Sequence, residues 1–172
     1  MAIIEAKKNT FSVDKGIAQG IDYADILDIP VVFSSNGDGF YEHDKTLSNG
    51  KLEQEITLDA FPSPSELWER YKKYKNISAK EEKTLLQEYY HDRGGRTPRY
   101  YQQIAINRSV EAIAKGQKRL LLVMATGTGK TYTAFQIIHR LWRSKTKKRI
   151  LFLADINALI DQTKKGDFRH FK

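Results

Sequence analysis

The sequence predicts an α/β protein made of two incomplete α/β parts joined by helices, and three patterns carry this prediction. Apolar runs at residues 120–125 and 150–154 alternate with helical segments, which is typical of a parallel sheet covered on both faces. A short apolar run at residues 2–6 leads into a helical pattern and then a hairpin signature. Capped helical segments lie between the two parts. We therefore expect three regions, at residues 1–60, 61–97 and 98–172.

The composition is typical of a globular protein with a polyanionic partner. The 172 residues include 29 lysines and arginines against 21 aspartates and glutamates, a net charge of +8, and this basic balance favours nucleic acid first. Charge alone fits equally well a protein that is merely basic. The lack of cysteine removes disulfides, thiolate zinc sites and cysteine nucleophiles, and it suits a reducing cytoplasm. No apolar run approaches the roughly 18–20 residues of a membrane span, so we expect no membrane partner and no signal peptide.

The first region is expected to contain strands and one helix. After the strand at residues 2–6, apolar residues recur at helical spacing and predict a helix from about residue 14 to residue 27. The sequence Asn-Gly-Asp-Gly at residues 36–39 accepts the positive φ of a tight turn, so the apolar residues on either side are expected to form a hairpin. Residues 51–58 could add one more strand.

Two helices are expected in the second region, at residues 64–75 and 79–91. Each begins with a serine that is followed three residues later by glutamate, the pattern of a capping box. We interpret the aromatic residues on these helices as packing and not as a base-stacking platform. The glycine- and proline-containing stretch at residues 93–98 is the expected boundary with the third region.

The strongest motif is MATGTGKT at residues 124–131, between an apolar run and a helical pattern. Gly127 and Gly129 let successive backbone N–H groups point at phosphates, and the helix N-terminus adds a favourable dipole. Lys130 can reach the β- and γ-phosphates, and the Thr131 hydroxyl can ligate Mg²⁺. The strict phosphate-loop pattern has glycine where the first methionine stands, so the match is incomplete. The alternative is a glycine-rich turn from strand to helix with an exposed lysine.

Gln102 lies one helix before this motif and predicts adenine as the base. A glutamine amide can hold both N6 and N7 of adenine. Taken alone, this glutamine is only a polar residue on an amphipathic helix, but the neighbouring phosphate loop favours the adenine role. We therefore expect ATP and Mg²⁺ as ligands. The expected nucleotide-binding residues are Gln102, Gly127, Thr128, Gly129, Lys130 and Thr131.

Three motifs together resemble those of superfamily 2 DNA translocases. RYYQ at residues 99–102, MATGTGKT at 124–131 and FLADINALIDQ at 152–162 are similar to the glutamine motif, motif I and motif Ia. The likeness is strongest to the restriction (R) subunit of type I restriction–modification enzymes and runs through essentially the whole chain. It implies that residues 98–172 are the first half of a RecA-like P-loop lobe. Motif Ia of that family often has arginine where Ile156 stands, a departure that weakens one proposed contact with the DNA backbone.

A second candidate site lies near the N-terminus, in the sequence Glu-Ala-Lys at residues 5–7. Glu5 and Lys7 are two residues apart and therefore project to the same face of a strand. The carboxylate can hold Mg²⁺, and the ammonium can orient or activate an attacking water. Gln19 and Tyr23 form the only Q-x-x-x-Y of the chain and lie one turn apart on the next helix. The alternative is a partly buried strand with a charged edge.

Strand E-x-K followed by helix Q-x-x-x-Y resembles the end of a PD-(D/E)xK nuclease core of the RecB-like type. Such cores also occur N-terminal to the motor in type I R subunits, so the resemblance implies that residues 1–60 are the C-terminal part of a nuclease core and 61–97 a helical linker. It implies catalytic roles for Glu5, Lys7, Gln19 and Tyr23. The metal ligands that it implies are Glu5 for the nuclease and Thr131 for the motor.

Two elements of the family pattern are missing from the sequence. No aspartate precedes Glu5 on a strand, and no Asp-Glu box follows motif Ia. We therefore expect a fragment of a longer subunit that is inactive by itself. The resemblance implies an ATP-dependent, DNA-translocating and DNA-cleaving enzyme that acts on double-stranded DNA with modification (methyltransferase) and specificity subunits in the cytoplasm. A noncatalytic nucleotide- or DNA-binding module and an unrelated P-loop ATPase remain as alternatives. The basic residues at 145–149 could contact DNA phosphates, although a solvated loop is favoured.

Overall fold

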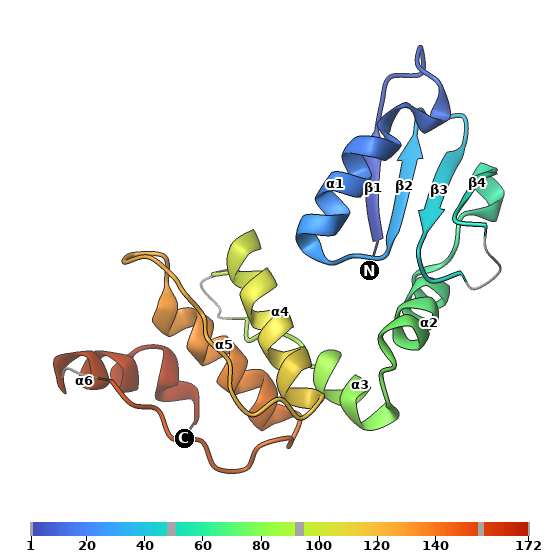
Figure 1. The fold of residues 1–172 in the computed structure, drawn as a ribbon. Coiled ribbons are helices and arrows are strands. Elements are labelled where there is room, and N and C mark those ends of the chain that lie inside the picture. Colours follow the sequence, from blue (N-terminus) through green and yellow to red (C-terminus); the bar gives the residue numbers. More distant parts are fainter. Residues whose placement is uncertain (1, 48–50, 92–94, 155–156, 172) are drawn as a thin grey trace. The chain divides into compact units, whose positions relative to one another are not determined.

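The computed structural model describes residues 2–47, 51–91, 95–154 and 157–171. The chain divides into two compact units, Met1–Ile77 and Ser78–Lys172, and Figure 1 colours them along the sequence. The division falls inside the stretch predicted as a helical linker, so each unit contains one of the two helices expected there. No helix in the described ranges is both long and apolar enough to cross a membrane.

The first unit is built on a mixed sheet of four strands in the order β1-β2-β3-β4, which Figure 1 shows side by side. They span Ala2–Ala6 (β1), Val31–Ser35 (β2), Phe40–Asp44 (β3) and Glu53–Ile56 (β4). β1 and β2 are parallel, while the pairs β2–β3 and β3–β4 are antiparallel. The predicted first strand and hairpin are confirmed, and the last strand is shorter than the sequence indicated.

A helical crossover joins β1 to β2, as the parallel pairing requires. A turn of 3-10 helix at Val13–Gly16 continues into α1 at Ile17–Leu27, which confirms the predicted helix. A Cβ atom at Gly20 would lie 2.5 Å from Cγ1 of Val32, so only glycine permits the close approach of α1 to the sheet.

Helix α2, Pro64–Lys75, completes the apolar core of the first unit. Its buried residue Leu67 packs with Val31 and Phe33 of β2, and Phe40 and Phe61 lie against this cluster. The predicted capping box is confirmed at its start: the Ser63 hydroxyl accepts the Glu66 N–H, and the Glu66 carboxylate accepts the Ser63 N–H at 2.7 Å.

A buried ionic cluster also joins α2 to the sheet. Nη1 of Arg70 donates to Glu42 Oε1 at 2.8 Å and to Asp44 Oδ2 at 3.0 Å. Both carboxylates lie on β3 and are buried. Burial lowers the pKa of the Arg70 guanidinium, but the two carboxylates outweigh burial and raise that pKa above its usual value. The cluster therefore keeps its charge compensated where water is excluded.

The second unit consists of helices, with no strand among its described residues. They are α3 (Ala79–Leu85), α4 (Tyr100–Ala114), α5 (Lys130–Arg143) and α6 (Asn157–Lys165), followed by a 3-10 turn at Asp167–Phe171. Phe135 of α5 lies in an aromatic core, with ring centroids of Tyr90, Phe168 and Phe171 at 5.3, 5.7 and 5.5 Å.

The helix predicted at residues 79–91 ends earlier, at Leu85. Side chains of α5 take the backbone groups that a longer helix would use: Gln136 bonds both the N–H and the C=O of Tyr90 at 2.9 Å, and Arg140 donates to the Leu85 carbonyl. Tertiary hydrogen bonds replace the helical ones, which local sequence does not reveal.

The parallel sheet predicted in the third region does not form among the described residues. Residues 120–125 and 150–154 lie outside any strand, and several of their apolar side chains are largely exposed, with Leu121 85%, Val123 89%, Leu151 81% and Leu153 79% exposed. Their neighbours Leu120, Leu122 and Ile150 are only 41%, 42% and 39% exposed. This alternation between more and less exposed side chains is typical of an extended chain. A run of apolar residues favours an extended backbone, but a strand also needs a neighbouring strand to which it can hydrogen-bond.

Candidate active site and phosphate-binding loop

The four residues predicted for cleavage lie in one hydrogen-bonded chain. Nζ of Lys7 contacts Glu5 Oε1 at 2.9 Å and donates to Gln19 Oε1 at 2.7 Å. The amide nitrogen of Gln19 in turn donates to the Tyr23 hydroxyl at 2.9 Å. The strand β1 supplies the first two residues and α1 the other two. The structure therefore brings together residues that are 18 positions apart in the sequence.

Two residues that the sequence reasoning missed shape this cluster. Glu5 is paired across the sheet with Ser34, whose hydroxyl accepts the N–H of Gly16 at 3.0 Å. A Cβ atom at Gly16 would lie 2.8 Å from both Glu5 Cγ and Ser34 Oγ. Gly16 therefore makes room for the carboxylate at the start of α1. The only sequence signal was a glycine four residues before Gly20, on the same face of the helix.

The cluster carries a carboxylate and an ammonium that water can reach. The side chains of Lys7 and Glu5 are 26% and 19% exposed, and two of the three Lys7 N–H groups are used. No group of three metal-ligating side chains occurs in the described ranges. Glu5 alone can still hold Mg²⁺, because this ion is commonly bound by one or two carboxylates together with water and substrate phosphate.

The predicted phosphate loop forms a tight turn in front of α5. Gly127 and Gly129 have φ values of 77° and 83°, a region that favours glycine, and α5 begins directly afterwards at Lys130. The Thr128 hydroxyl donates to the Ala125 carbonyl at 2.6 Å and closes the turn. The backbone at Met124 is not in the left-handed region, so glycine is not required where the strict pattern has it.

Lys130 lies across this turn. Its ammonium donates to the carbonyls of Ala125 at 3.2 Å and Met124 at 3.4 Å, and the side chain is exposed. Carbonyl oxygens are weaker partners for an ammonium than anionic oxygens are. The arrangement can therefore exchange these two contacts for contacts with phosphate. Thr131 is exposed in the first turn of the helix.

Gln102 is buried against the loop. Its Nε2 donates to the Thr128 carbonyl at 2.8 Å, and its Oε1 accepts the Arg99 N–H at 2.9 Å. The amide keeps one N–H and one lone pair, the pair of groups that adenine needs. Tyr101, for which the sequence indicated no role, donates its hydroxyl to the same Thr128 carbonyl at 3.3 Å.

The third predicted motif is described only in part. Asp155 and Ile156 lie outside the described residues. Residues Asn157–Lys165 form α6, so the polar end of the motif is helical.

Comparison with known proteins places the chain in a family. Residues 96–172 match the family described as Type III restriction enzyme, res subunit. The type I restriction enzyme EcoAI endonuclease subunit of Escherichia coli is 58% identical over 172 residues, which cover 99% of this chain and 21% of that protein. The EcoKI endonuclease subunit of Escherichia coli strain K12 is 53% identical over 64 residues, 37% of this chain and 6% of that protein.

A solved fragment assigned as the HsdR subunit of a type I restriction enzyme from Vibrio vulnificus YJ016 has the same fold. It is 43% identical, with a TM-score of 0.70, over 84% of this chain and 26% of the solved one. The chain thus spans about a fifth of the EcoAI relative and about a quarter of the Vibrio structure. Identity at this level along nearly the whole chain, together with the shared fold, shows that it belongs to the restriction (R) subunits of type I restriction–modification enzymes over the part of them that it spans.

Proposed function

We propose that this chain is part of the ATP-dependent subunit that translocates and cleaves DNA in a type I restriction endonuclease. The subunit acts on double-stranded DNA in the cytoplasm, together with a modification (methyltransferase) subunit and a specificity subunit. The observation that carries the proposal is the hydrogen-bonded chain from Glu5 to Tyr23. It occurs in a sequence that is 58% identical to an endonuclease subunit.

In the proposed cleavage site, Glu5 holds Mg²⁺ and Lys7 orients the attacking water. When bound, Mg²⁺ supplies charge neutralisation at the scissile phosphate. The contacts with Glu5 and Gln19 fix the Lys7 ammonium. Its third N–H then remains to bind the attacking water. Tyr23 holds the Gln19 amide, so Gln19 and Tyr23 are positioning residues.

In the proposed nucleotide site, the backbone N–H groups of the loop and Lys130 bind the phosphates of ATP. Gly127, Thr128 and Gly129 supply the turn, and Thr131 supplies a hydroxyl for Mg²⁺. Gln102 reads adenine with its remaining N–H and lone pair, while its bond to Thr128 holds the loop and its bond to Arg99 holds the start of α4. We propose that this chain binds ATP–Mg²⁺ by itself but does not hydrolyse it, because its sequence has no Asp-Glu pair to complete the site.

A chimera tests the cleavage site. This chain replaces the matching region of the EcoAI subunit, and Glu5→Ala and Lys7→Ala are assayed for nicking and ATP hydrolysis side by side. Both variants should lose cleavage and keep ATPase activity, because the cluster and the phosphate loop lie in different units. Gln19→Ala and Tyr23→Phe should reduce cleavage more mildly. Normal nicking by Glu5→Ala would end the assignment, and a parallel loss of ATPase activity would indicate a role in folding.

Titration of the 172-residue chain with ATP and Mg²⁺ tests the nucleotide site. Lys130→Ala should abolish binding because it removes the charge that faces the phosphates, whereas Lys118→Ala, at another exposed lysine of the same unit, should not. DNA-stimulated ATP hydrolysis by the unmodified chain would contradict the proposed inactivity.

A further inference from the structure

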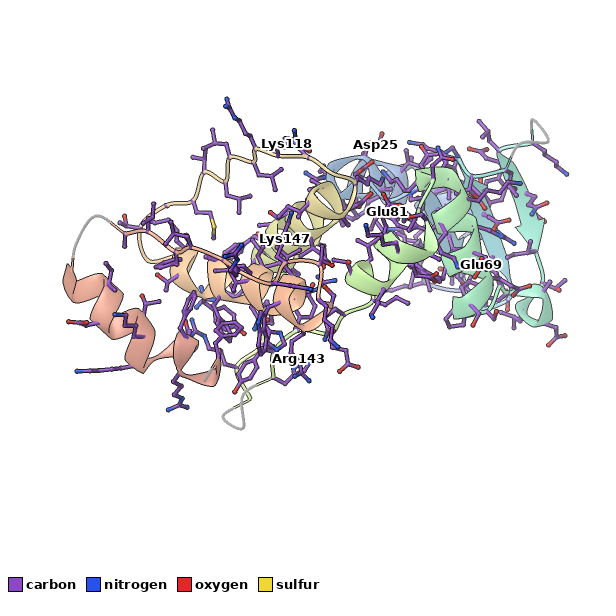
Figure 2. The ribbon with its side chains drawn as sticks, turned by 90° about the horizontal axis from the view of Figure 1, so that it is seen from below. Asp25, Glu69, Glu81, Lys118, Arg143 and Lys147 are labelled. Atoms are coloured by element: carbon purple, nitrogen blue, oxygen red, sulfur yellow. The ribbon has the colours of Figure 1, made fainter. Side chains whose placement is uncertain are left out.

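A basic groove lies at the C-terminal end of α5, at the opposite end of this helix from the phosphate loop. It has a volume of about 290 Å³ and is lined by Trp142, Arg143, Lys145, Lys147 and Lys148. All five side chains are exposed, and none of the lining residues is acidic. Figure 2 labels Arg143 and Lys147. The groove thus combines one large aromatic ring with four cations.

Hydrogen bonds hold the groove in shape. The hydroxyls of Ser144 and Thr84 both lie within hydrogen-bonding distance of the Thr146 hydroxyl, at 2.9 and 2.6 Å, and the N–H of Lys147 donates to the Leu141 carbonyl at 3.1 Å. Lys145 has φ 62°, so a lysine occupies the position after the helix end where glycine is usual. The turn is therefore fixed in a conformation that its own sequence does not favour.

The four cations lack ion-pair partners in the part of the chain that the structure describes. Other lysines do have them: Lys7 pairs with Glu5, Lys45 with Asp25 and Lys75 with Asp28. Cations gathered without compensation repel one another and attract a polyanion. The charge of the groove thus favours a ligand with several regularly spaced negative groups.

Trp142 determines which polyanion fits. Its indole is 39% exposed and is held by an edge-on contact with Phe171, with ring centroids 5.4 Å apart. Bases of single-stranded nucleic acid stack on such rings while cations follow the phosphates. In duplex DNA the bases already stack on one another, and an acidic peptide rarely offers a flat ring. Single-stranded nucleic acid uses every group that lines the groove.

We propose that this groove is a binding site for single-stranded DNA, with one base stacked on Trp142 and the phosphates on the four cations. Helix α5 has 14 residues, so the groove lies about 20 Å along the helix from Lys130. Binding here is independent of the phosphate loop and of the cleavage cluster. Failure of the nucleotide or cleavage assays therefore leaves this proposal standing, and the reverse also holds.

The test is binding of a labelled oligothymidine strand by fluorescence anisotropy over a range of salt concentrations. Trp142→Ala should weaken binding about 5- to 150-fold, the range for loss of one stacked base. Replacement of Lys145, Lys147 and Lys148 by alanine should weaken binding and lower the salt slope by about 2, since each phosphate contact on a single strand contributes about 0.7. In a Trp68→Phe background, the strand should quench the remaining tryptophan fluorescence, which comes from Trp142.

A matched control removes three exposed lysines elsewhere in the same unit, at Lys80, Lys83 and Lys118. Both triple variants change the net charge from +8 to +5, so general electrostatic attraction predicts equal losses and the groove predicts a smaller loss for the control. Lys145→Gly separates binding from folding. It should raise the unfolding midpoint, because glycine accepts the positive φ, and still weaken binding.

Equal losses in the two triple variants would overturn the proposal, as would unchanged binding by Trp142→Ala. Competition decides between ligand classes. Displacement of oligothymidine by poly-glutamate at equal charge concentration, or equal affinity for a duplex of the same length, would assign the groove to an acidic peptide or to DNA phosphates alone. Displacement only by other single strands supports the proposal.

Discussion

A single missing side chain controls the geometry of the cluster proposed for cleavage. Gly16 lies where α1 begins, and the space its hydrogen atom leaves is occupied by Glu5 and Ser34. The backbone N–H of the same residue donates to Ser34. Position 16 therefore sets the distance between helix and sheet at the point where the carboxylate is held.

Gly16→Ala should lower the free energy of unfolding by about 1–3 kcal/mol, the usual range for overpacking. The added methyl meets Glu5 Cγ and Ser34 Oγ at 2.8 Å, and one of them must move. Urea unfolding measures the loss. In the double variant with Ser34→Ala one of the two clashes is gone, so the combined effect should be smaller than the sum of the single effects. Strict additivity would contradict this account.

One experiment can separate the two roles proposed for Gln102. If the amide reads adenine, Gln102→Ala in the chain should weaken ATP more than GTP, with about 1–3 kcal/mol of lost discrimination. If it only holds the loop through Thr128, both nucleotides should lose affinity equally, because the loop is proposed to bind the phosphates that ATP and GTP share. Isothermal titration with both nucleotides measures the difference. Tyr101→Phe is the matched control, since it removes a loop contact without touching the amide.

At the scale of elements, helix starts were predictable because their signals are local. Ser63 and Ser78 each cap a helix with the glutamate three residues on, as their spacing indicated. The strands expected at residues 120–125 and 150–154 do not form. An apolar run could not predict this outcome, because a strand also depends on neighbouring strands that the run does not specify. The contacts that end α3 at Leu85 come from side chains about 50 residues away, so the sequence pattern around residue 85 could not contain them.

The two capping boxes should make stability fall in acid. Hydrogen bonds from Ser63 lower the pKa of Glu66, and those from Ser78 lower the pKa of Glu81, below the ordinary 4.5. A depressed pKa contributes stability above the unfolded value and loses it as pH falls through the folded one. Replacing both glutamates by glutamine should therefore flatten the acid slope of the unfolding midpoint below about pH 4.5. The control variant carries the same replacement at Glu55 and Glu88, which lie outside helix starts. Its acid slope should stay steeper than that of the variant without Glu66 and Glu81.

The cluster that joins α2 to β3 should be the costliest contact of the first unit to break. Arg70→Met leaves Glu42 and Asp44 buried without a counter-charge, and removal of one side of such a cluster costs about 3–5 kcal/mol. Urea unfolding should show this loss. Adding Glu42→Gln and Asp44→Asn should restore most of it, whereas Lys73→Met, exposed on the same helix, should change stability by less than about 0.5 kcal/mol.

At the scale of the whole molecule, the candidate sites were easier to find than the architecture around them. Strand and helix periodicities predicted that Glu5 shares a face with Lys7 and Gln19 with Tyr23, and in the structure hydrogen bonds join the two pairs. Their supports could not be found in this way, because Ser34 reaches the cluster through strand pairing and not through spacing. Pattern thus predicted which side chains lie together, and tertiary packing supplied what holds them.

The two exposed apolar runs, at residues 120–123 and 150–153, make the self-association of this chain depend on salt. Their open faces attract like faces on other copies, and a net charge of +8 keeps the copies apart. Salt shortens the reach of that repulsion from about 10 Å at 0.1 M to about 3 Å at 1 M. Light scattering should therefore rise with salt, and Val123→Lys with Leu151→Lys should move the onset to higher concentrations. The ionic strength of the buffer therefore controls whether the chain remains monomeric in solution or aggregates.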